Sequence, residues 1–163
     1  MRDERAYATV VACFAAFLYL AVLVAAFGLI SLATDTEVVA DPAAGPLVGP
    51  IMTGASVGVL LVLLIVSGTR VPGDQQRIAP LAAIGCGIAC YLTYCAAGGV
   101  AGALVAGDIL HFALFAVGQL GSAYAITAGL VAFLVTLLYQ LVLVGRFRQR
   151  GRPRWPWEHD GEA

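Results

Sequence analysis

The chain has 163 residues, of which 61% are hydrophobic and 12% are charged, and its formal net charge is -1. A typical soluble domain contains about 45–50% apolar and about 25% charged residues, so the composition excludes an ordinary water-soluble fold and predicts an integral membrane protein. All 9 basic residues are arginines, and their positions indicate how the chain crosses the membrane.

The first predicted span covers about residues 7–33. Residues 6–34 contain no charged side chain, and this stretch exceeds the ~20 apolar residues that cross a bilayer. The alternative is a secretory signal peptide, because Ser31, Leu32 and Ala33 resemble a cleavage site. A signal peptide has an apolar core of only about 7–15 residues, so we expect an uncleaved helix.

The second predicted span covers about residues 47–69. The connection before it, residues 35–46, carries three acidic side chains and no basic one, which predicts an extracytoplasmic loop. Pro50 falls in the first turn of the span, where a missing amide hydrogen costs nothing. Arg70 and Arg77 flank the loop that follows, which predicts that this loop lies on the cytoplasmic side.

Between residues 78 and 145 the only charged side chain is Asp108, so either two or three spans fit the length. Three spans would leave the basic C-terminal tail outside the cell, against the preference of arginine for the cytoplasmic side. We therefore predict two spans, at about residues 78–97 and 121–145, with both termini in the cytoplasm.

The stretch between these two spans is too apolar for an ordinary loop. Its glycine-rich part, residues 98–107, either extends the third helix or breaks it. Residues 109–120 predict a short helix with Asp108 as its N-cap. A run of about 10–14 apolar residues favours an interfacial or re-entrant helix, and the remaining alternative is that it lengthens the last span.

These elements predict an all-α fold: a transmembrane four-helix bundle with a short apolar interfacial or re-entrant helix before the last span. The four-span domain covers residues 1–145 and a cytoplasmic tail covers residues 146–163. The predicted location is the inner, cytoplasmic membrane.

Small residues predict how the helices associate. Gly54 and Gly58 form a G-x-x-x-G pair in the second span, and small residues allow close approach of helices in lipid, where the hydrophobic effect is absent. We expect packing within the bundle, and the alternative is a homodimer face built on these two glycines.

The residue types argue against catalysis. Cys86 and Cys90 have the spacing C-x-x-x-C, which does not fit the C-x-x-C pair of thiol oxidoreductases, so buried structural cysteines are expected. Only 2 histidines are present and only His111 is near the membrane, which excludes a haem with two histidine ligands. No catalytic or cofactor-binding residues are predicted.

Asp108 and His111 are the best polar pair in the chain. Their spacing of three residues would allow both side chains to bind a metal ion or relay a proton at the extracytoplasmic surface. Two ligands make a weak metal site, so a helix cap beside an interfacial histidine is the preferred explanation of the pair. The four predicted spans hold no ionisable Asp, Glu, Arg or Lys, so a transport path has little support.

The tail after residue 145 combines basic and aromatic residues: Arg146, Arg148, Arg150, Arg152, Arg154, Trp155 and Trp157. The arginines attract anionic lipid headgroups, and tryptophan rings settle at the headgroup level. The alternative is a docking peptide for a protein partner. Nucleic-acid binding is not expected, because the membrane offers a nearer polyanion.

The complete use of arginine for basic residues is typical of a GC-rich genome. With the span count and the closing Arg-Pro-Arg-Trp-Pro-Trp-Glu, residues 152–158, the chain resembles an uncharacterised family of small four-span membrane proteins of actinobacteria. This resemblance implies location and architecture. The leading hypothesis is a non-enzymatic accessory or structural subunit that packs with itself, as a homo-oligomer, or with a larger membrane partner. The alternative is a small transporter or channel near Asp108 and His111.

Overall fold

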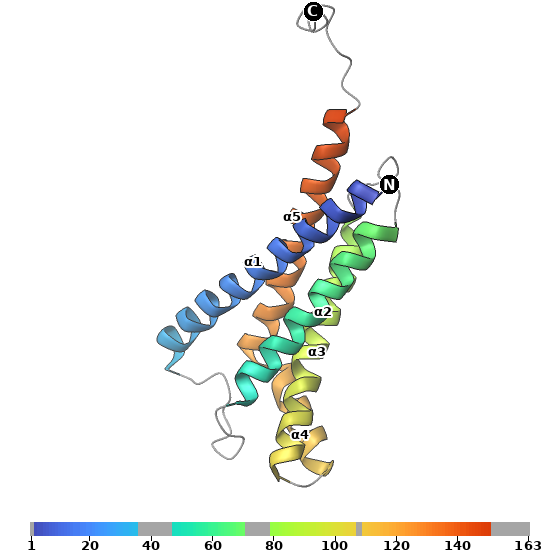
Figure 1. Ribbon diagram of the computed structural model, residues 1–163. Helices are drawn as coiled ribbons and strands as arrows, with labels where there is room; N and C mark the ends of the chain where they lie inside the picture. The colour runs from blue at the N-terminus through green and yellow to red at the C-terminus, as the bar shows by residue number, and fades with distance from the viewer. Residues whose placement is uncertain (1, 36–46, 71–78, 107–108, 151–163) are drawn as a thin grey trace, which may run out of the picture.

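The computed structural model describes residues 2–35, 47–70, 79–106 and 109–150, and these residues form helices without any strand. In chain order the helices are α1 (Arg2–Thr34), α2 (Val48–Arg70), α3 (Pro80–Ala106), α4 (Ile109–Leu120) and α5 (Ala123–Arg150) (Figure 1).

Four of these helices contain stretches that are long and apolar enough to cross a bilayer: Ala6–Thr34, Val48–Arg70, Pro80–Leu104 and Ala123–Gly145. The fifth, α4, is the short apolar helix before the last span. The predicted fold class is therefore confirmed.

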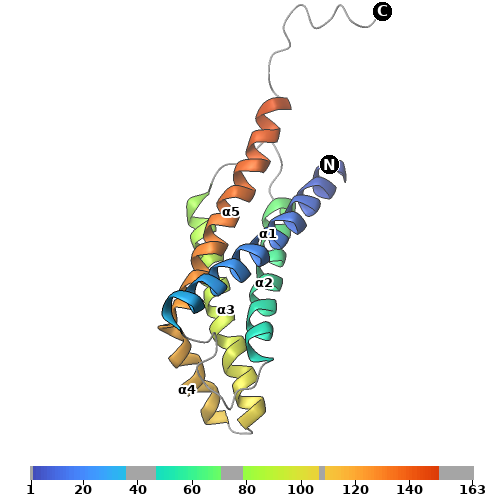
Figure 2. The ribbon, with the colours of Figure 1, turned by 90° about the vertical axis from the view of Figure 1, so that its left-hand side faces the viewer.

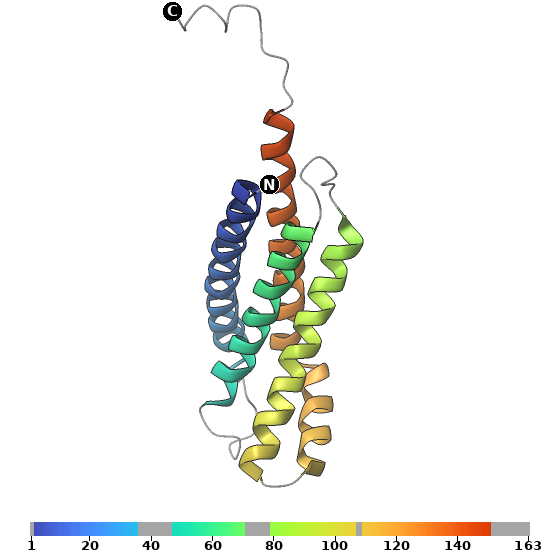
Figure 3. The ribbon, with the colours of Figure 1, turned by 45° about the vertical axis from the view of Figure 1, so that its right-hand side comes forward.

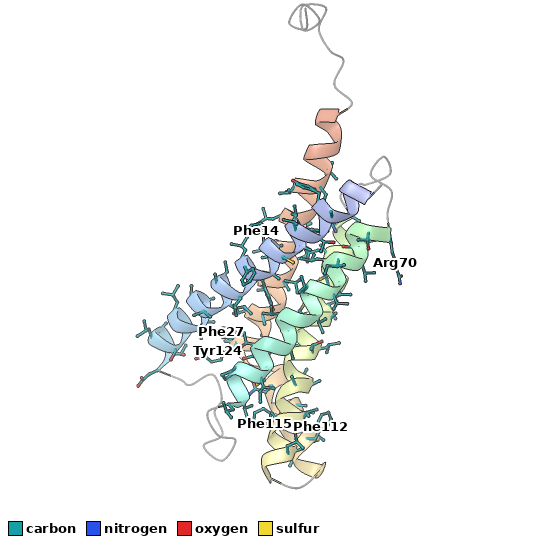
Figure 4. The ribbon with its side chains drawn as sticks, in the orientation of Figure 1. Phe14, Phe27, Arg70, Phe112, Phe115 and Tyr124 are labelled. Atoms are coloured by element: carbon teal, nitrogen blue, oxygen red, sulfur yellow. The ribbon has the colours of Figure 1, made fainter. Side chains whose placement is uncertain are left out.

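The four long helices form a ring in which each contacts two neighbours closely. α1 lies against α2 and α5, and α3 lies against the same two helices from the other side. α1 crosses the bundle obliquely (Figure 2), and its C-terminal half diverges from α2 (Figure 1). The start of α1, the Arg70 end of α2 and the basic end of α5 all lie at one end of the bundle (Figures 1 and 4).

The interior of the bundle combines many small side chains with buried tyrosines and leucines, while many other large apolar side chains point outward. Many of the buried residues of α1 and α5 are alanines: Ala8, Ala12, Ala15, Ala16, Ala125, Ala128 and Ala132. Phe14 and Phe17 are each 71% exposed and Leu32 is 85% exposed; Figure 4 labels Phe14 on the outer side of α1. This distribution suits a lipid solvent, because helices associate there through close contact and not through burial of apolar surface.

α3 continues through the glycine-rich stretch to Ala106, beyond the predicted end at residue 97. A glycine inside a helix costs about 0.5–1 kcal/mol relative to alanine, but here the missing side chains admit α4. A Cβ at Gly99 would lie 2.9 Å from the Phe112 carbonyl oxygen, and one at Gly98 would lie 2.9 Å from the Phe115 ring. α4 therefore runs lengthwise beside the end of α3 (Figure 3).

A short break separates α4 from α5. The Ser122 amide donates to the Gln119 carbonyl oxygen at 3.0 Å, and the Ile126 amide then donates to the Ser122 carbonyl oxygen at 3.1 Å, which starts α5. The Tyr91 hydroxyl of α3 donates to the Leu120 carbonyl oxygen at 2.6 Å. This bond satisfies a carbonyl at the end of α4 that lacks a helical partner.

Candidate functional site

The polar groups at the centre of the bundle join all four long helices. The Tyr19 hydroxyl of α1 lies 2.8 Å from Ser56 Oγ of α2 and donates to the Ala128 carbonyl oxygen of α5 at 3.1 Å. Ser56 Oγ also donates to the Cys90 carbonyl oxygen of α3 at 3.3 Å. Two hydroxyl protons thus serve three contacts, so two of these bonds form at a time.

Cys90 completes a reciprocal contact between α2 and α3. Its Sγ lies 3.8 Å from the Ser56 carbonyl oxygen, to which the thiol donates. Cys86, Cys90 and Cys95 are buried free thiols, whereas Cys13 is exposed on the outside of α1. The three buried cysteines belong to the hydrophobic core of the bundle, and the burial of Cys86 and Cys90 agrees with the prediction.

Tyr139 of α5 makes a second link between helices, near the start of α1 and the end of α2. Its hydroxyl lies 3.0 Å from the Leu64 carbonyl oxygen of α2 and 3.3 Å from the Ala8 carbonyl oxygen of α1, and these two acceptors share its single proton. Gly68 leaves the space for this hydroxyl, because a Cβ at that position would collide with it. One phenol therefore holds α5 against two neighbouring helices.

An aromatic cluster fills the bundle where α1 begins to diverge. Phe27 packs edge-on against Tyr94 and Tyr124, with ring centroids 5.9 Å and 5.3 Å apart (Figure 4). The Tyr94 hydroxyl is buried and has no hydrogen-bond partner. The cluster is a packing feature of α1, α3 and α5.

Gln140 fixes the start of α3. Its Oε1 accepts a hydrogen bond from the Ala79 amide at 3.0 Å, and its Nε2 lies 3.4 Å from the Ala79 carbonyl oxygen, to which it donates. The amide of a residue just before a helix has no carbonyl acceptor within that helix. The Gln140 side chain supplies the missing acceptor for Ala79.

Several other hydroxyls in the described helices donate to carbonyls one turn earlier, as Thr53 does with Gly49 at 3.0 Å and Thr136 with Ala132 at 2.8 Å. Side chains that bond to backbone carbonyls link helices to one another or stabilise a single helix. None of these bonds aligns a nucleophile with a base.

Gly54 and Gly58 differ from the glycines at which helices of the bundle meet. Both lie on the exposed side of α2, and nothing approaches within 4 Å of a Cβ built at either position. The bundle therefore does not use this pair for internal packing. The opposite side of α2 supplies the buried positions Met52, Ser56 and Leu60.

Other predicted residues fall partly or wholly outside the described part of the chain. His111 lies in the first turn of α4 and its side chain is not described, and Asp108 lies outside the described residues. Residues 146–150 form the end of α5, so the helix continues into the predicted tail. Arg152, Arg154, Trp155 and Trp157 lie outside the described residues. Within the described ranges, no group of three or more His, Cys, Asp and Glu side chains is placed to hold a metal ion.

The contact between α3 and α5 forms a groove that the sequence does not reveal. A Cβ at Gly87 would lie 2.9 Å from the Gly129 carbonyl oxygen, and one at Gly129 would lie 3.0 Å from Tyr91 Cβ, so the two backbones meet at these glycines. The larger side chains beside them border an open apolar groove of about 380 Å³, lined by Ile84, Gly87, Ile88, Tyr91, Ile126, Gly129, Leu130 and Phe133.

Four apolar helices of spanning length and a surface of large apolar side chains define a multi-pass integral membrane protein. The chain belongs to a family of unknown function (DUF6121), whose sequence profile matches residues 1–163. No curated protein and no solved structure matches the chain.

Proposed function

We propose that this protein is a non-enzymatic structural or accessory subunit of the bacterial inner membrane that associates with a second copy through the outer face of α2. The observation that carries the proposal is the open position of Gly54 and Gly58. A larger membrane partner with a complementary small-residue helix is the alternative occupant of the same face. The exclusive use of arginine among the basic residues supports an actinobacterial origin.

The contrast among glycines supports self-association. Gly68, Gly87 and Gly129 each meet an atom of another helix within 3.3 Å of a built Cβ, so internal packing explains them. Gly54 and Gly58 have no such neighbour and lie one turn apart on one exposed face. Small residues at this spacing allow two membrane helices to approach closely.

The proposed orientation has both termini in the cytoplasm. Arg70 ends α2 and Arg146 lies near the end of α5, and these ends lie together with the start of α1, which carries Arg2 and Arg5 (Figure 1). Retention of arginine on the cytoplasmic side supports this threading. The basic tail would then face anionic headgroups, each arginine contributing about 1 kcal/mol.

Replacing both Gly54 and Gly58 by leucine is expected to weaken self-association of the protein in lipid bilayers at least about fivefold, equivalent to about 1 kcal/mol. Leucine side chains would hold the two backbones apart, but inside each protomer they meet open space. Dimer fractions at several protein-to-lipid ratios, measured by single-molecule photobleaching in liposomes, provide the readout.

Gly28→Leu is the matched control, because Gly28 is an exposed glycine with nothing within 4 Å of its built Cβ and large residues four positions away on either side. This variant should dimerise like the wild type. A wild-type protein that stays monomeric at every ratio, without a co-purifying membrane protein, would rule out the proposal.

A further inference from the structure

We propose that the α3–α4 hairpin, formed by residues 98–106 of α3 and by α4, binds acyl chains of the leaflet opposite Arg70, so that the protein fits a bilayer whose hydrocarbon core exceeds the usual ~30 Å. The hairpin is separate from the exposed face of α2 that carries Gly54 and Gly58. Lipid binding at the hairpin therefore does not depend on self-association.

The α3–α4 hairpin extends beyond the neighbouring end of α2 (Figures 1 and 3). The two helices meet at Gly98, where a built Cβ would lie 2.7 Å from Met52 Cε. From this contact α2 continues outward from position 52 to Val48, which is about 6 Å at about 1.5 Å per residue. α3 continues from position 98 to Ala106, which is about 12 Å. The hairpin thus projects past α2 by about one helical turn.

Large apolar side chains cover the outside of the hairpin. Leu104 of α3 is 80% exposed, and Leu114 and Val117 of α4 are 64% and 65% exposed. Among residues 98–104 and 112–120, whose side chains the structure describes, Gln119 is the only polar side chain, and it is 8% exposed. A hairpin in water would show the reverse pattern, because glutamine is mostly exposed in water-soluble folds. The surroundings that suit this hairpin are therefore hydrocarbon.

The exposed side chains of the two helices point away from each other, which favours lipid over a protein partner. Gly99 and Gly102 of α3 face α4, and helical periodicity places Leu104 on the opposite side of α3. Phe115 of α4 faces α3, and the same periodicity places Val117 on the other side of α4. A single partner helix would cover only one of these two sides, whereas acyl chains surround both.

The lengths of the helices indicate a thick hydrocarbon core on the α3 side. α3 has 27 residues, or about 40 Å, and α2 has 23 residues, or about 34 Å. A bilayer accommodates a long apolar helix by local thickening or by tilt of the helix. A tilt of the whole bundle that fitted α3 to about 30 Å would shorten α2 to about 26 Å along the membrane normal. Thickening around the hairpin fits both helices.

The test uses the full chain with a nitroxide spin label at one introduced cysteine, at a low protein-to-lipid ratio in dioleoylphosphatidylcholine. Collisions with oxygen report hydrocarbon, collisions with a water-soluble nickel chelate report water, and a label covered by protein meets neither. Cys13→Ser is the background, because the other three cysteines are buried. Labels at Leu104→Cys and Leu114→Cys should show the same high oxygen-to-nickel collision ratio as the control Leu134→Cys, an exposed position midway along the α5 span.

The fit to a thick core is tested by changing the length of the lipid chains. In dimyristoleoylphosphatidylcholine, whose chains are shorter, the ratio at Leu104→Cys should fall several-fold, whereas the longer chains of dierucoylphosphatidylcholine should preserve it. The ratio at Leu134→Cys should stay constant in all three lipids. An unchanged ratio at Leu104→Cys would refute the fit to a thicker core.

Two further results would overturn lipid binding by the hairpin. Frequent collisions with the nickel chelate at Leu104→Cys and Leu114→Cys in every lipid would place the hairpin in water. Infrequent collisions with both reagents would show that a second copy or another protein covers it. Dimerisation through α2 is measured independently by photobleaching, so its failure would leave these collision ratios unchanged.

Discussion

Replacing Gly87 by alanine is expected to lower the free energy of unfolding by about 1–3 kcal/mol, the usual cost of inserting a methyl group into a tightly packed contact. The added Cβ would lie 2.9 Å from the Gly129 carbonyl oxygen and 3.1 Å from Phe133 Cβ. A backbone oxygen cannot rotate away as the end of a side chain can, so α3 and α5 must separate. Titration with sodium dodecyl sulfate in mixed micelles measures the change.

Gly85→Ala provides the control on the same helix. Nothing lies within 4 Å of a Cβ at Gly85, and alanine is favoured over glycine in a helix by about 0.5–1 kcal/mol. This variant should therefore be neutral or slightly stabilised, so the two substitutions are expected to differ in sign. Equal stability of both variants would show that α3 and α5 are not in contact at Gly87.

The second large effect is expected at Tyr19. Tyr19→Phe removes the hydroxyl that lies 2.8 Å from Ser56 Oγ and 3.1 Å from the Ala128 carbonyl oxygen. Side-chain hydrogen bonds between membrane helices contribute about 0.6 kcal/mol on average and about 1.7 kcal/mol at most. Because this hydroxyl can donate to the Ala128 carbonyl oxygen of α5 while it accepts from Ser56 Oγ of α2, the loss should fall in the upper part of that range in the same unfolding titration.

Tyr94→Phe is the matched variant, since its hydroxyl is buried without a hydrogen-bond partner. An unsatisfied buried hydroxyl costs about 1–3 kcal/mol, so removing it should leave the protein as stable as before or more stable. A double-mutant cycle of Tyr19→Phe with Ser56→Ala should give a nonzero coupling energy. Additive effects, or a loss at Tyr94 larger than at Tyr19, would contradict the described network.

The spans could be predicted because they depend on local properties of the chain. Residues 6–34 lack charge over more than a bilayer thickness, and the arginines lie at span ends, so hydropathy and charge define where helices begin and end. The length of α3 could not be predicted, because glycines at 98, 99 and 102 disfavour a helix on their own. They remain helical because Phe112 and Phe115 of α4 pack where side chains would be.

Which face of each helix turns inward was less predictable. In water a polar and an apolar face reveal the orientation of a helix, but lipid is as apolar as the bundle interior, so that pattern is weak here. The spacing of Gly54 and Gly58 is visible within one helix, yet they lie outside. The close contact between α3 and α5 is made by Gly87 and Gly129. These two glycines belong to different helices, so no sequence spacing predicts that they meet.

The most direct test of the four-span threading measures the side of the membrane on which its ends lie. Paired fusions of alkaline phosphatase, active only outside the cytoplasm, and green fluorescent protein, fluorescent only inside, can be placed after residue 40, after residue 74 and at the C-terminus. The account predicts phosphatase activity only at residue 40 and fluorescence at the other two positions. Phosphatase activity at the C-terminus would contradict it, because the last span would then run in the opposite direction.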